Sequence, residues 1–313
     1  MSIDLFIEPG KVYTWEDFLT EKPPFSIGLD GIISGPTMRD NYGPYANFDH
    51  HHPSIDRLST RSTSAQVHME INMGLFDVFK KKGVPYVNIF INDPDEDACL
   101  SSFQLKHHEL VKGHGNPKLN RLVYCEDMLD CTAGAYPFGD IRIRRQMAWI
   151  FLPYTEARFE KRLGDMGIAE MRDVVEAVYG RIEQYLFEEC GEIALDGHYE
   201  RIGGGKKWAL VKETGPAARM ALYNDKINAF ISLLGENGGG FYRYAVNKRS
   251  PWTPFDNRKV YARANEEEKV LGSEINEENK WGGSDITGGS PRETGSLIFP
   301  DKLEKIVNEV IDV

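Results

Sequence analysis

Four short apolar segments that run directly into acidic residues constrain the fold of this chain more than any other feature. Each segment is rich in aromatic and β-branched residues, which is typical of a buried strand. The segments are residues 25–29 before Asp30, 45–48 before Asp49, 86–91 before Asn92 and Asp93, and 122–125 before Glu126 and Asp127. The chain is therefore expected to form a sheet whose strand ends carry acids.

Helical patterns lie between these segments. Thr63 and Gln66 form a capping-box pattern at the start of one predicted helix, and residues 96–112 predict another that Gly113 closes. Strands that alternate with helices predict an α/β fold with a mostly parallel sheet flanked by helices. Such sheets bind ligands at the carboxyl ends of their strands, which is where these acids fall.

The pattern changes after the last of these segments. Residues 141–190 carry apolar side chains at helical spacing and predict a helical connector. Residues 265–279 are polar and acidic and predict a solvated loop. The chain then reaches a predicted terminal helix with an apolar stripe from Leu303 to Ile311.

The length of 313 residues is enough for two domains, each with its own core. We expect the first at residues 1–195, including the connector, and a smaller α/β domain at residues 196–313. Apolar residues make up 41% and charged residues 27% of the chain, as in a globular protein. No long uncharged apolar run occurs and the first residues lack a signal-peptide pattern, so we expect a cytoplasmic protein that does not bind membranes.

The formal net charge of -11 argues against a protein that coats long duplex nucleic acid through a basic face. It is compatible with a carboxylate-rich metal site, because bound cations neutralise clustered acids. The four cysteines, Cys99, Cys125, Cys131 and Cys190, do not approach a Cys-x-x-Cys spacing, so we expect buried, reduced thiols.

The run Asp49-His50-His51-His52 follows one of the predicted strands. Imidazole and carboxylate groups are the usual ligands of manganese, iron and zinc, and a strand end holds them on a rigid base. The alternative is a surface histidine cluster; a purification tag would lie at a terminus and not within the chain. We interpret the run as part of a metal site.

Two further acidic stretches complete a ligand set. Each is also compatible with an acidic loop that caps a helix. Two metal ions about 3.5 to 4 Å apart require about five to seven oxygen and nitrogen ligands. The predicted metal ligands are Asp30, Asp49, His50, Asp93, Asp95, Asp97 and Asp127.

Taken together, these stretches resemble the DHH phosphoesterase superfamily. Asp49-His50-His51, with Ser62-Thr63-Ser64-Ala65 opening a helix, resembles its third and fourth motifs, and Asp93-Pro94-Asp95-Glu96-Asp97-Ala98 with Ser101 resembles its first, usually His-x-Asp-x-Asp. Asp30 fits the second motif and Asp127 the later aspartate. Asp93 stands where the family has histidine, and the motif order is circularly permuted.

This resemblance implies a chemistry and a role for each residue. Members of the superfamily bind two divalent ions, usually Mn²⁺ with Mg²⁺ as the other candidate, and hydrolyse phosphate esters or anhydrides. The implied ligands are Asp30, His50, Asp95, Asp97 and Asp127. Asp49 would orient His50, and His51 would contact the substrate phosphate. No role follows for His52 or Asp130.

A glycine-rich stretch from Trp281 to Arg292 resembles the substrate loop of the DHH-associated domain. The implied substrate-binding residues are Gly282, Gly283, Ser290 and Arg292, because backbone amides and a basic side chain approach phosphate in such a loop. A flexible turn is the alternative. Aromatic and basic residues in the stretch 241–252 either stack a base and bind phosphate or pack as ordinary aromatics beside a turn.

The sequence therefore predicts a two-metal-dependent phosphoesterase that hydrolyses a phosphodiester or phosphoanhydride, with a nucleotide or short oligonucleotide as the substrate class. His51 and Arg292 are the predicted catalytic residues, which would hold the departing or flanking phosphate. One alternative is a non-catalytic metal or nucleotide sensor on the same fold; another is a structural protein with a vestigial site. The sequence leaves open whether the chain forms a homodimer.

A second histidine group falls at the end of a predicted helix and consists of His107, His108 and His114. Cations at this end of a helix offset its dipole, so we expect these three residues at the surface.

Overall fold

A computed structural model of the chain describes residues 2–40, 42–52, 55, 59–113, 115–160, 162–237, 239–276 and 279–311. The chain divides into two compact units. Unit 1 comprises Met1–Cys131 and Phe138–Ala194, and unit 2 comprises Thr132–Pro137 and Leu195–Val313. The division after Ala194 lies next to the boundary expected from the sequence.

Unit 1 is built on a six-stranded sheet with the order β1-β6-β2-β4-β3, in which β5 also pairs with β6. Its strands are β1 (Ser2–Ile7), β2 (Ser26–Leu29), β3 (Met38–Arg39), β4 (Tyr45–Phe48), β5 (Lys80–Lys81) and β6 (Val84–Ile91). Strands β1, β6, β2 and β4 are parallel to one another, whereas β3 and β5 are antiparallel to their neighbours. The carboxyl ends of β2, β4 and β6 therefore meet at one edge.

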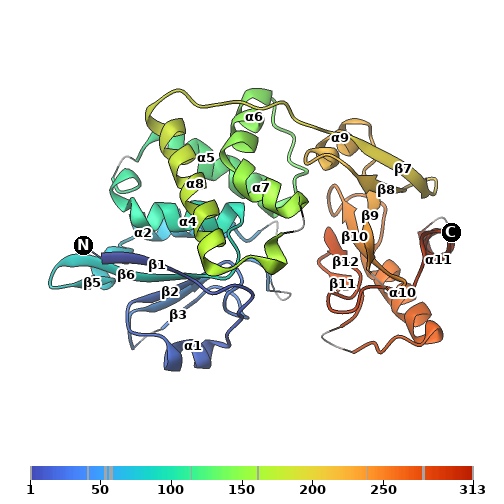
Figure 1. Ribbon diagram of the computed structural model, residues 1–313, viewed down its shortest axis with the longest axis horizontal. Coiled ribbons are helices and arrows are strands. Elements are labelled where there is room, and N and C mark those ends of the chain that lie inside the picture. Colours follow the sequence, from blue (N-terminus) through green and yellow to red (C-terminus); the bar gives the residue numbers. More distant parts are fainter. Residues whose placement is uncertain are drawn as a thin grey trace. The chain divides into compact units, whose positions relative to one another are not determined.

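Helices cover both faces of this sheet (Figure 1). They are α1 (Trp15–Glu21), α2 (Thr63–Asn72), α3 (Leu75–Val78), α4 (Glu96–Lys106), α5 (Pro117–Cys131), α6 (Ile141–Ile150), α7 (Leu152–Phe159) and α8 (Ile168–Phe187). Alternation along β6 explains the two faces: Ile89 and Ile91 join the larger core, while Phe90 packs edge-on against Phe18 of α1 on the other side.

The predicted helical connector is an integral part of unit 1. Met171, Val175, Val178 and Ile182 of α8 are buried in the same core as the sheet. Their spacing places them on one stripe of the helix, and α8 packs against α4 and α5. The connector thus completes the core and does not serve as a spacer.

Unit 2 has a second six-stranded sheet, with the order β11-β12-β10-β9-β8-β7. Its elements are β7 (Tyr199–Gly204), β8 (Ala209–Glu213), α9 (Ala218–Asn224), β9 (Ala229–Asn237), β10 (Phe241–Lys248), α10 (Asn257–Leu271), β11 (Gly282–Gly283), β12 (Thr287–Gly289) and α11 (Pro300–Ile311). Leu210 packs toward α10 and α11, and Val211 packs toward α9 on the opposite face.

A buried carboxylate ties the glycine-rich stretch to α10. Glu268 is fully buried and accepts hydrogen bonds from Trp281 Nε1 at 2.9 Å, Ser273 Oγ at 2.6 Å and the Leu297 backbone at 3.2 Å. Glu268 therefore holds the segments that contain Ser273, Trp281 and Leu297 in place against α10.

Several expectations from the sequence are wrong. The sheets are mixed and not mostly parallel: β3 and β5 are antiparallel to their neighbours in unit 1, and β8–β9 is the only parallel pair among the described strands of unit 2. Residues 122–125 lie within α5, and residues 265–271 belong to α10 instead of a solvated loop. A short apolar run does not distinguish a strand from a buried stretch of helix.

One member of the second histidine group, His108, is buried and not at the surface as expected, while the His107 side chain is 34% exposed. His108 is 2% exposed and packs on Phe76 at a ring distance of 4.2 Å, and His107 stacks on Phe103 at 4.3 Å. Burial lowers the pKa of both imidazoles. His114 lies outside the described residues.

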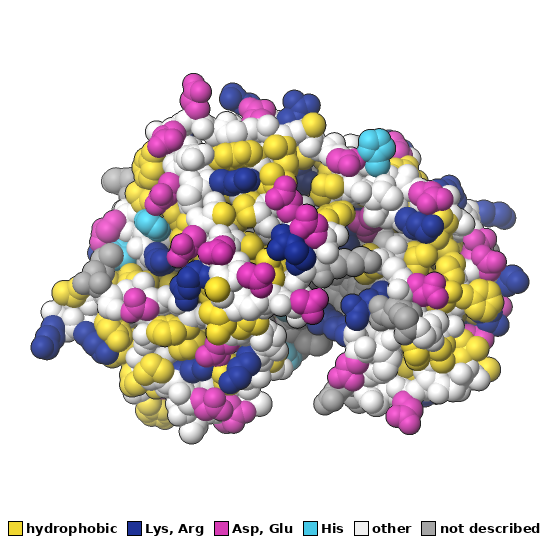
Figure 2. Space-filling model, in the orientation of Figure 1, with side chains coloured by type: hydrophobic (Ala, Val, Ile, Leu, Met, Phe, Trp, Pro, Cys, Tyr) yellow, Lys and Arg dark blue, Asp and Glu magenta, His cyan; other side chains and the backbone are white. Residues whose placement is uncertain are grey.

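Among the described residues, no helix is both long and apolar enough to cross a lipid bilayer. Basic side chains on the face shown in Figure 2 are interspersed with acidic ones.

Candidate metal centre

The carboxyl ends of β2 and β4 bring the first acids together. Leu29 pairs with Phe48 in the parallel register, so the next residues, Asp30 and Asp49, leave the sheet side by side. The Asp30 backbone N–H donates to Phe48 O at 3.0 Å. Asp30 has a φ of 51°, in the left-handed region that non-glycine residues rarely adopt. This turn directs the buried Asp30 side chain back across the sheet edge.

His50 lies at the centre of the acids. Its ring is fully buried, and Nε2 lies 2.6 Å from Asp130 Oδ2 and 3.7 Å from both Asp30 Oδ1 and Asp97 Oδ2. Two groups of potential ligands share this residue: Asp30, His50 and His51 form one, and His50, Asp97 and Asp130 form the other. Within each group the ligand atoms lie within 4.8 Å of one another, which is close enough for a single metal ion.

The stretch after β6 positions two of the predicted ligands at the start of α4. Asp95 is the N-cap and accepts from Ala98 N at 2.8 Å. Asp97 accepts from the backbone N–H groups of Thr63 at 2.6 Å and Ser64 at 2.7 Å. Those amides belong to the first turn of α2, so Asp97 joins two helix N-termini at the site.

The N-terminus of α2 is itself capped within the site. Ser62, one residue before the predicted cap, is the N-cap, and its Oγ accepts from Ala65 N at 3.3 Å. The hydroxyl groups of Ser62 and Ser64 donate to Glu126 at 3.1 and 2.7 Å, and Thr63 Oγ1 donates to Asp30 at 3.0 Å. Three consecutive hydroxyl side chains thus orient the carboxylates around His50.

Helix α5 contributes three acids, Glu126, Asp127 and Asp130, which the sequence had placed after a strand. Asp127 accepts from Ser62 N at 2.7 Å and lies 3.3 Å from Arg61 Nη1, and it belongs to neither of the two ligand groups. Asp130, three residues further along the helix, lies against His50 instead. Glu126 is buried and faces Ser62 and Ser64. The structure thus places Asp130 beside His50, whereas the sequence predicted Asp127 as a ligand and gave Asp130 no role.

Burial and mutual repulsion raise the pKa values of these acids. Burial raises the pKa of Asp30 well above its usual range, and the carboxylates of Asp97 and Asp130 raise it further. Burial followed by the charge of Asp30 does the same for Asp95, and burial followed by Asp97 and Asp130 does so for Glu126. Clustered carboxylates of this kind resist ionisation until a cation neutralises them.

The pKa of His50 also shows that the surrounding carboxylates favour a positive charge at this position. Burial by itself lowers this pKa, but the Asp130 carboxylate outweighs burial and raises it to about 11. This raised pKa favours the protonated imidazole beside Asp130 when no metal is bound. Since a metal ligand must be a neutral imidazole, a divalent ion would replace this proton.

Two buried oxygens support the fit of a cation. Asp30 Oδ2 and Asp93 Oδ1 have no hydrogen-bond donor in the part of the chain that the structure describes. A buried anionic oxygen without a donor is costly, and metal coordination satisfies it. The charge of Asp93 raises the pKa of Asp95, so these two carboxyl groups are neighbours, while Asp93 belongs to neither of the two ligand groups.

His51 lies at the rim of the centre. Its side chain is 41% exposed, and Nδ1 lies 3.3 Å from both Asp30 Oδ1 and Asp49 Oδ1. Asp49 also accepts from the His51 backbone N–H at 3.0 Å. Asp49 therefore orients His51, whereas the sequence suggested that it would orient His50.

The predicted substrate residues of unit 2 form a hairpin and not a flexible loop. Gly282 and Gly283 pair with Gly289 and Gly288 across β11 and β12. A side chain at Gly283 would meet Gly288 Cα at 2.3 Å, so close strand packing accounts for this glycine. Ser290 is bonded to Tyr244, and Arg292 is exposed.

Comparisons with protein-family models, curated protein sequences and solved structures each gave no match. The likeness to the DHH superfamily therefore rests on the motifs alone and stays a prediction. Sequence reasoning did not include Asp130 and Glu126 among the site residues. Glu126 and Asp130 are four residues apart, so they would share a helix face if residues 122–131 had been taken as helical.

Proposed function

We propose that unit 1 is a two-metal-dependent phosphoesterase that hydrolyses a phosphodiester or phosphoanhydride. The observation that carries this proposal is the position of His50, which belongs to two adjoining groups of ligand atoms. Two-metal hydrolases hold their ions about 3.5 to 4 Å apart, so two adjoining ligand groups suit such a pair. A neutral imidazole nitrogen has a single lone pair, so His50 would bind one ion, and a carboxylate with its two oxygens would be the ligand shared between them. The proposed ligands are Asp30, His50, Asp95, Asp97 and Asp130, with Mn²⁺ the first candidate and Mg²⁺ the second.

When bound, the ions would lower the pKa of water and neutralise charge on the phosphate. The protein contributes orientation. Thr63 Oγ1 and the amides of α2 fix the carboxylates of Asp30 and Asp97, so the ligands are held before any substrate arrives. His51, half-exposed and held by Asp49, is placed to donate to a non-bridging or leaving phosphate oxygen. Arg292 of unit 2 stays a sequence-based candidate for the same task.

The experiment is hydrolysis of bis(p-nitrophenyl) phosphate by the full chain with Mn²⁺, with Mg²⁺ and with EDTA. We expect turnover with metal and none with EDTA. His50→Ala and Asp130→Asn should lose at least about a hundredfold in rate, because each removes a ligand or its orientation. His198→Ala is the matched control, since His198 is 87% exposed and lies in unit 2.

An inactive wild-type protein under all three conditions contradicts the catalytic proposal. Metal analysis then decides between the alternatives. Stoichiometric metal without turnover indicates a metal or nucleotide sensor, while absence of bound metal after incubation with Mn²⁺ contradicts the metal centre itself.

A further inference from the structure

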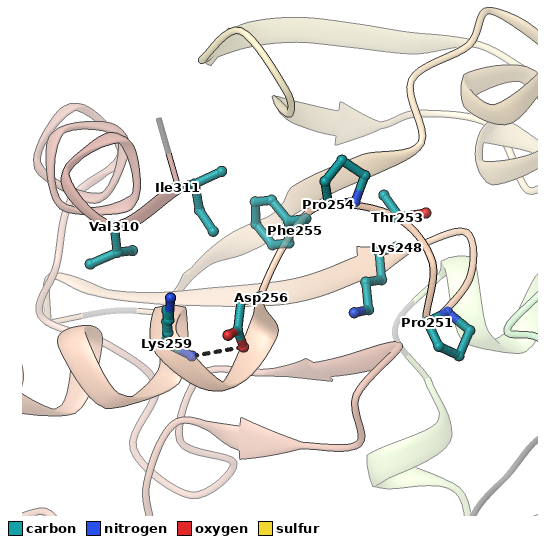
Figure 3. A pocket seen from close by; sticks show the side chains of 9 residues that line it. All are labelled: Lys248, Pro251, Thr253, Pro254, Phe255, Asp256, Lys259, Val310 and Ile311. Atoms are coloured by element: carbon teal, nitrogen blue, oxygen red, sulfur yellow. Dashed lines mark hydrogen bonds between the residues drawn. The ribbon is translucent and has the colours of Figure 1, made fainter. Parts of the chain in front are cut away.

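Unit 2 contains a pocket that the proposed metal chemistry does not use. Two adjoining cavities of about 370 and 330 Å³ share Lys248 and Asp256 in their walls. Volumes of about 300 to 1,000 Å³ are typical of small-molecule sites. The larger cavity lies between the end of β10, the loop before α10 and the last turn of α11 (Figure 3).

Lys248 is the unusual residue of this pocket. It is only 8% exposed, although lysine is almost never buried without a partner. Among the described residues, no carboxylate or carbonyl forms an ion pair or hydrogen bond with its ammonium group, which faces both cavities. Its backbone is firmly held as the last residue of β10, where Lys248 N donates to Ile286 O at 2.9 Å. The Lys248 stem is buried while its ammonium group opens on the cavities, and a firmly held cation in this position can pair with an anionic ligand.

The N-terminus of α10 alone does not provide this anion site. The Asp256 side chain caps the helix and accepts from Arg258 N at 3.1 Å and Lys259 N at 3.3 Å. Its carboxylate thus already occupies the position that an anion would take at the helix end. In Figure 3 the Lys259 side chain lies beside the same space, so Lys248 and Lys259 supply the free positive charge.

The remaining polar groups of the pocket are the exposed Arg258, the Thr253 hydroxyl and two acceptors. Asn257 is 1% exposed, and its Oδ1 has no donor in the described part of the chain. The half-buried Asp285 carboxylate lines the same cavity. Acceptors beside a cation would repel a bare inorganic anion at that end, but they fit a ligand that carries hydroxyl groups next to its phosphate.

We propose that this pocket binds a small hydroxylated phosphate monoester of the sugar-phosphate class. The phosphate pairs with Lys248 and Lys259, and the sugar hydroxyl groups donate to Asn257 Oδ1 and Asp285. Phe255, which is 2% exposed, forms an apolar part of the wall. The inference does not depend on the metal centre, because every residue in it belongs to unit 2.

The test is isothermal titration calorimetry of the full chain with ribose 5-phosphate in EDTA, which removes any contribution from metal. Parallel titrations use ribose and inorganic phosphate. We expect ribose 5-phosphate to bind at least tenfold more tightly than either. No measurable binding of ribose 5-phosphate, or equal binding of ribose, overturns the proposal.

Substitutions locate the binding. Lys248→Met, which keeps the length of the side chain and removes its charge, should weaken binding at least tenfold. Lys259→Met should weaken binding severalfold. Because Lys259 is exposed, this substitution leaves the fold intact and still tests the site if Lys248→Met does not fold. Lys269→Met is the control, since Lys269 is exposed near the other end of α10. Unchanged affinity in both Lys248→Met and Lys259→Met contradicts the assignment.

Discussion

The different roles of Asp127 and Asp130 give the sharpest test of the candidate centre. Asp127 is 3% exposed and holds the Ser62 amide at 2.7 Å, so its role in the structure is to fix the start of α2. Asp130 instead lies 2.6 Å from His50. The variants Asp127→Asn and Asp130→Asn remove one negative charge each and change little volume, and they should behave differently.

Asp127→Asn should destabilise the metal-free protein. The asparagine Oδ1 still accepts from Ser62 N, but the bond is no longer charge-assisted, which costs about 1 to 1.5 kcal/mol. The partner Arg61 has a side chain that is 57% exposed, so its ion pair adds little. For a unit of this size the loss corresponds to a decrease of about 2 to 6 °C in Tm.

The response to Mn²⁺ separates the two variants. At a Mn²⁺ concentration about 100 times Kd, binding stabilises the folded state by about 2.7 kcal/mol, or about 5 to 10 °C. Asp127→Asn should retain this increase. If Asp130→Asn weakens binding tenfold, the same concentration is about 10 times Kd and the increase should fall to about half.

Differential scanning fluorimetry of the three proteins with and without MnCl₂ measures both effects. The reasoning is refuted if Asp127→Asn loses the Mn²⁺-induced increase while Asp130→Asn keeps it, because that result restores the ligand assignment made from the sequence.

Three other outcomes follow from buried groups. Glu268→Ala should lower the free energy of unfolding in urea by about 3 kcal/mol or more, because three donors lose their acceptor, whereas Glu266→Ala, at an exposed position of the same helix, should change it by less than about 0.5 kcal/mol. Burial lowers the pKa of His108, so the unfolded chain binds a proton more readily and the free energy of unfolding should fall as the pH drops below about 6.5. In urea unfolding at about pH 5.5 and 7.5, His108→Phe should reduce this change in the free energy of unfolding with pH. An unchanged difference between the two pH values contradicts the argument. Iodoacetamide should label the partly exposed Cys190 in the native protein before the fully buried Cys99, whose thiol pKa is also raised by burial; mass spectrometry of the labelled peptides checks the order.

Local patterns were sufficient for much of unit 1. The apolar segments before Asp30, Asp49 and Asp93 form β2, β4 and β6 close to their predicted bounds, because β-branched and aromatic residues favour buried strands. The terminal stripe from Leu303 to Ile311 forms α11 because its apolar residues recur at helical spacing.

Local patterns failed where two structures suit the same residues. The run Leu122–Cys125 is short and apolar, and only its packing within α5 against α2 and α4 makes it helical. The edge strands β3 and β5 are two residues long, too short for a period to show, so the mixed character of the sheet was not visible in the sequence.

The sequence by itself determined the inventory of the candidate centre: a histidine run and acids at strand ends, which suit a divalent cation because of their chemistry. Only the tertiary structure decided which of these groups meet. Asp97 joins the amides of α2, and Asp130 and not Asp127 reaches His50. Each of these contacts joins separate elements or depends on how a turn of helix faces the sheet. The sequence pattern shows which imidazole and carboxylate groups are present, whereas the packing of α2, α4 and α5 sets the distances between them.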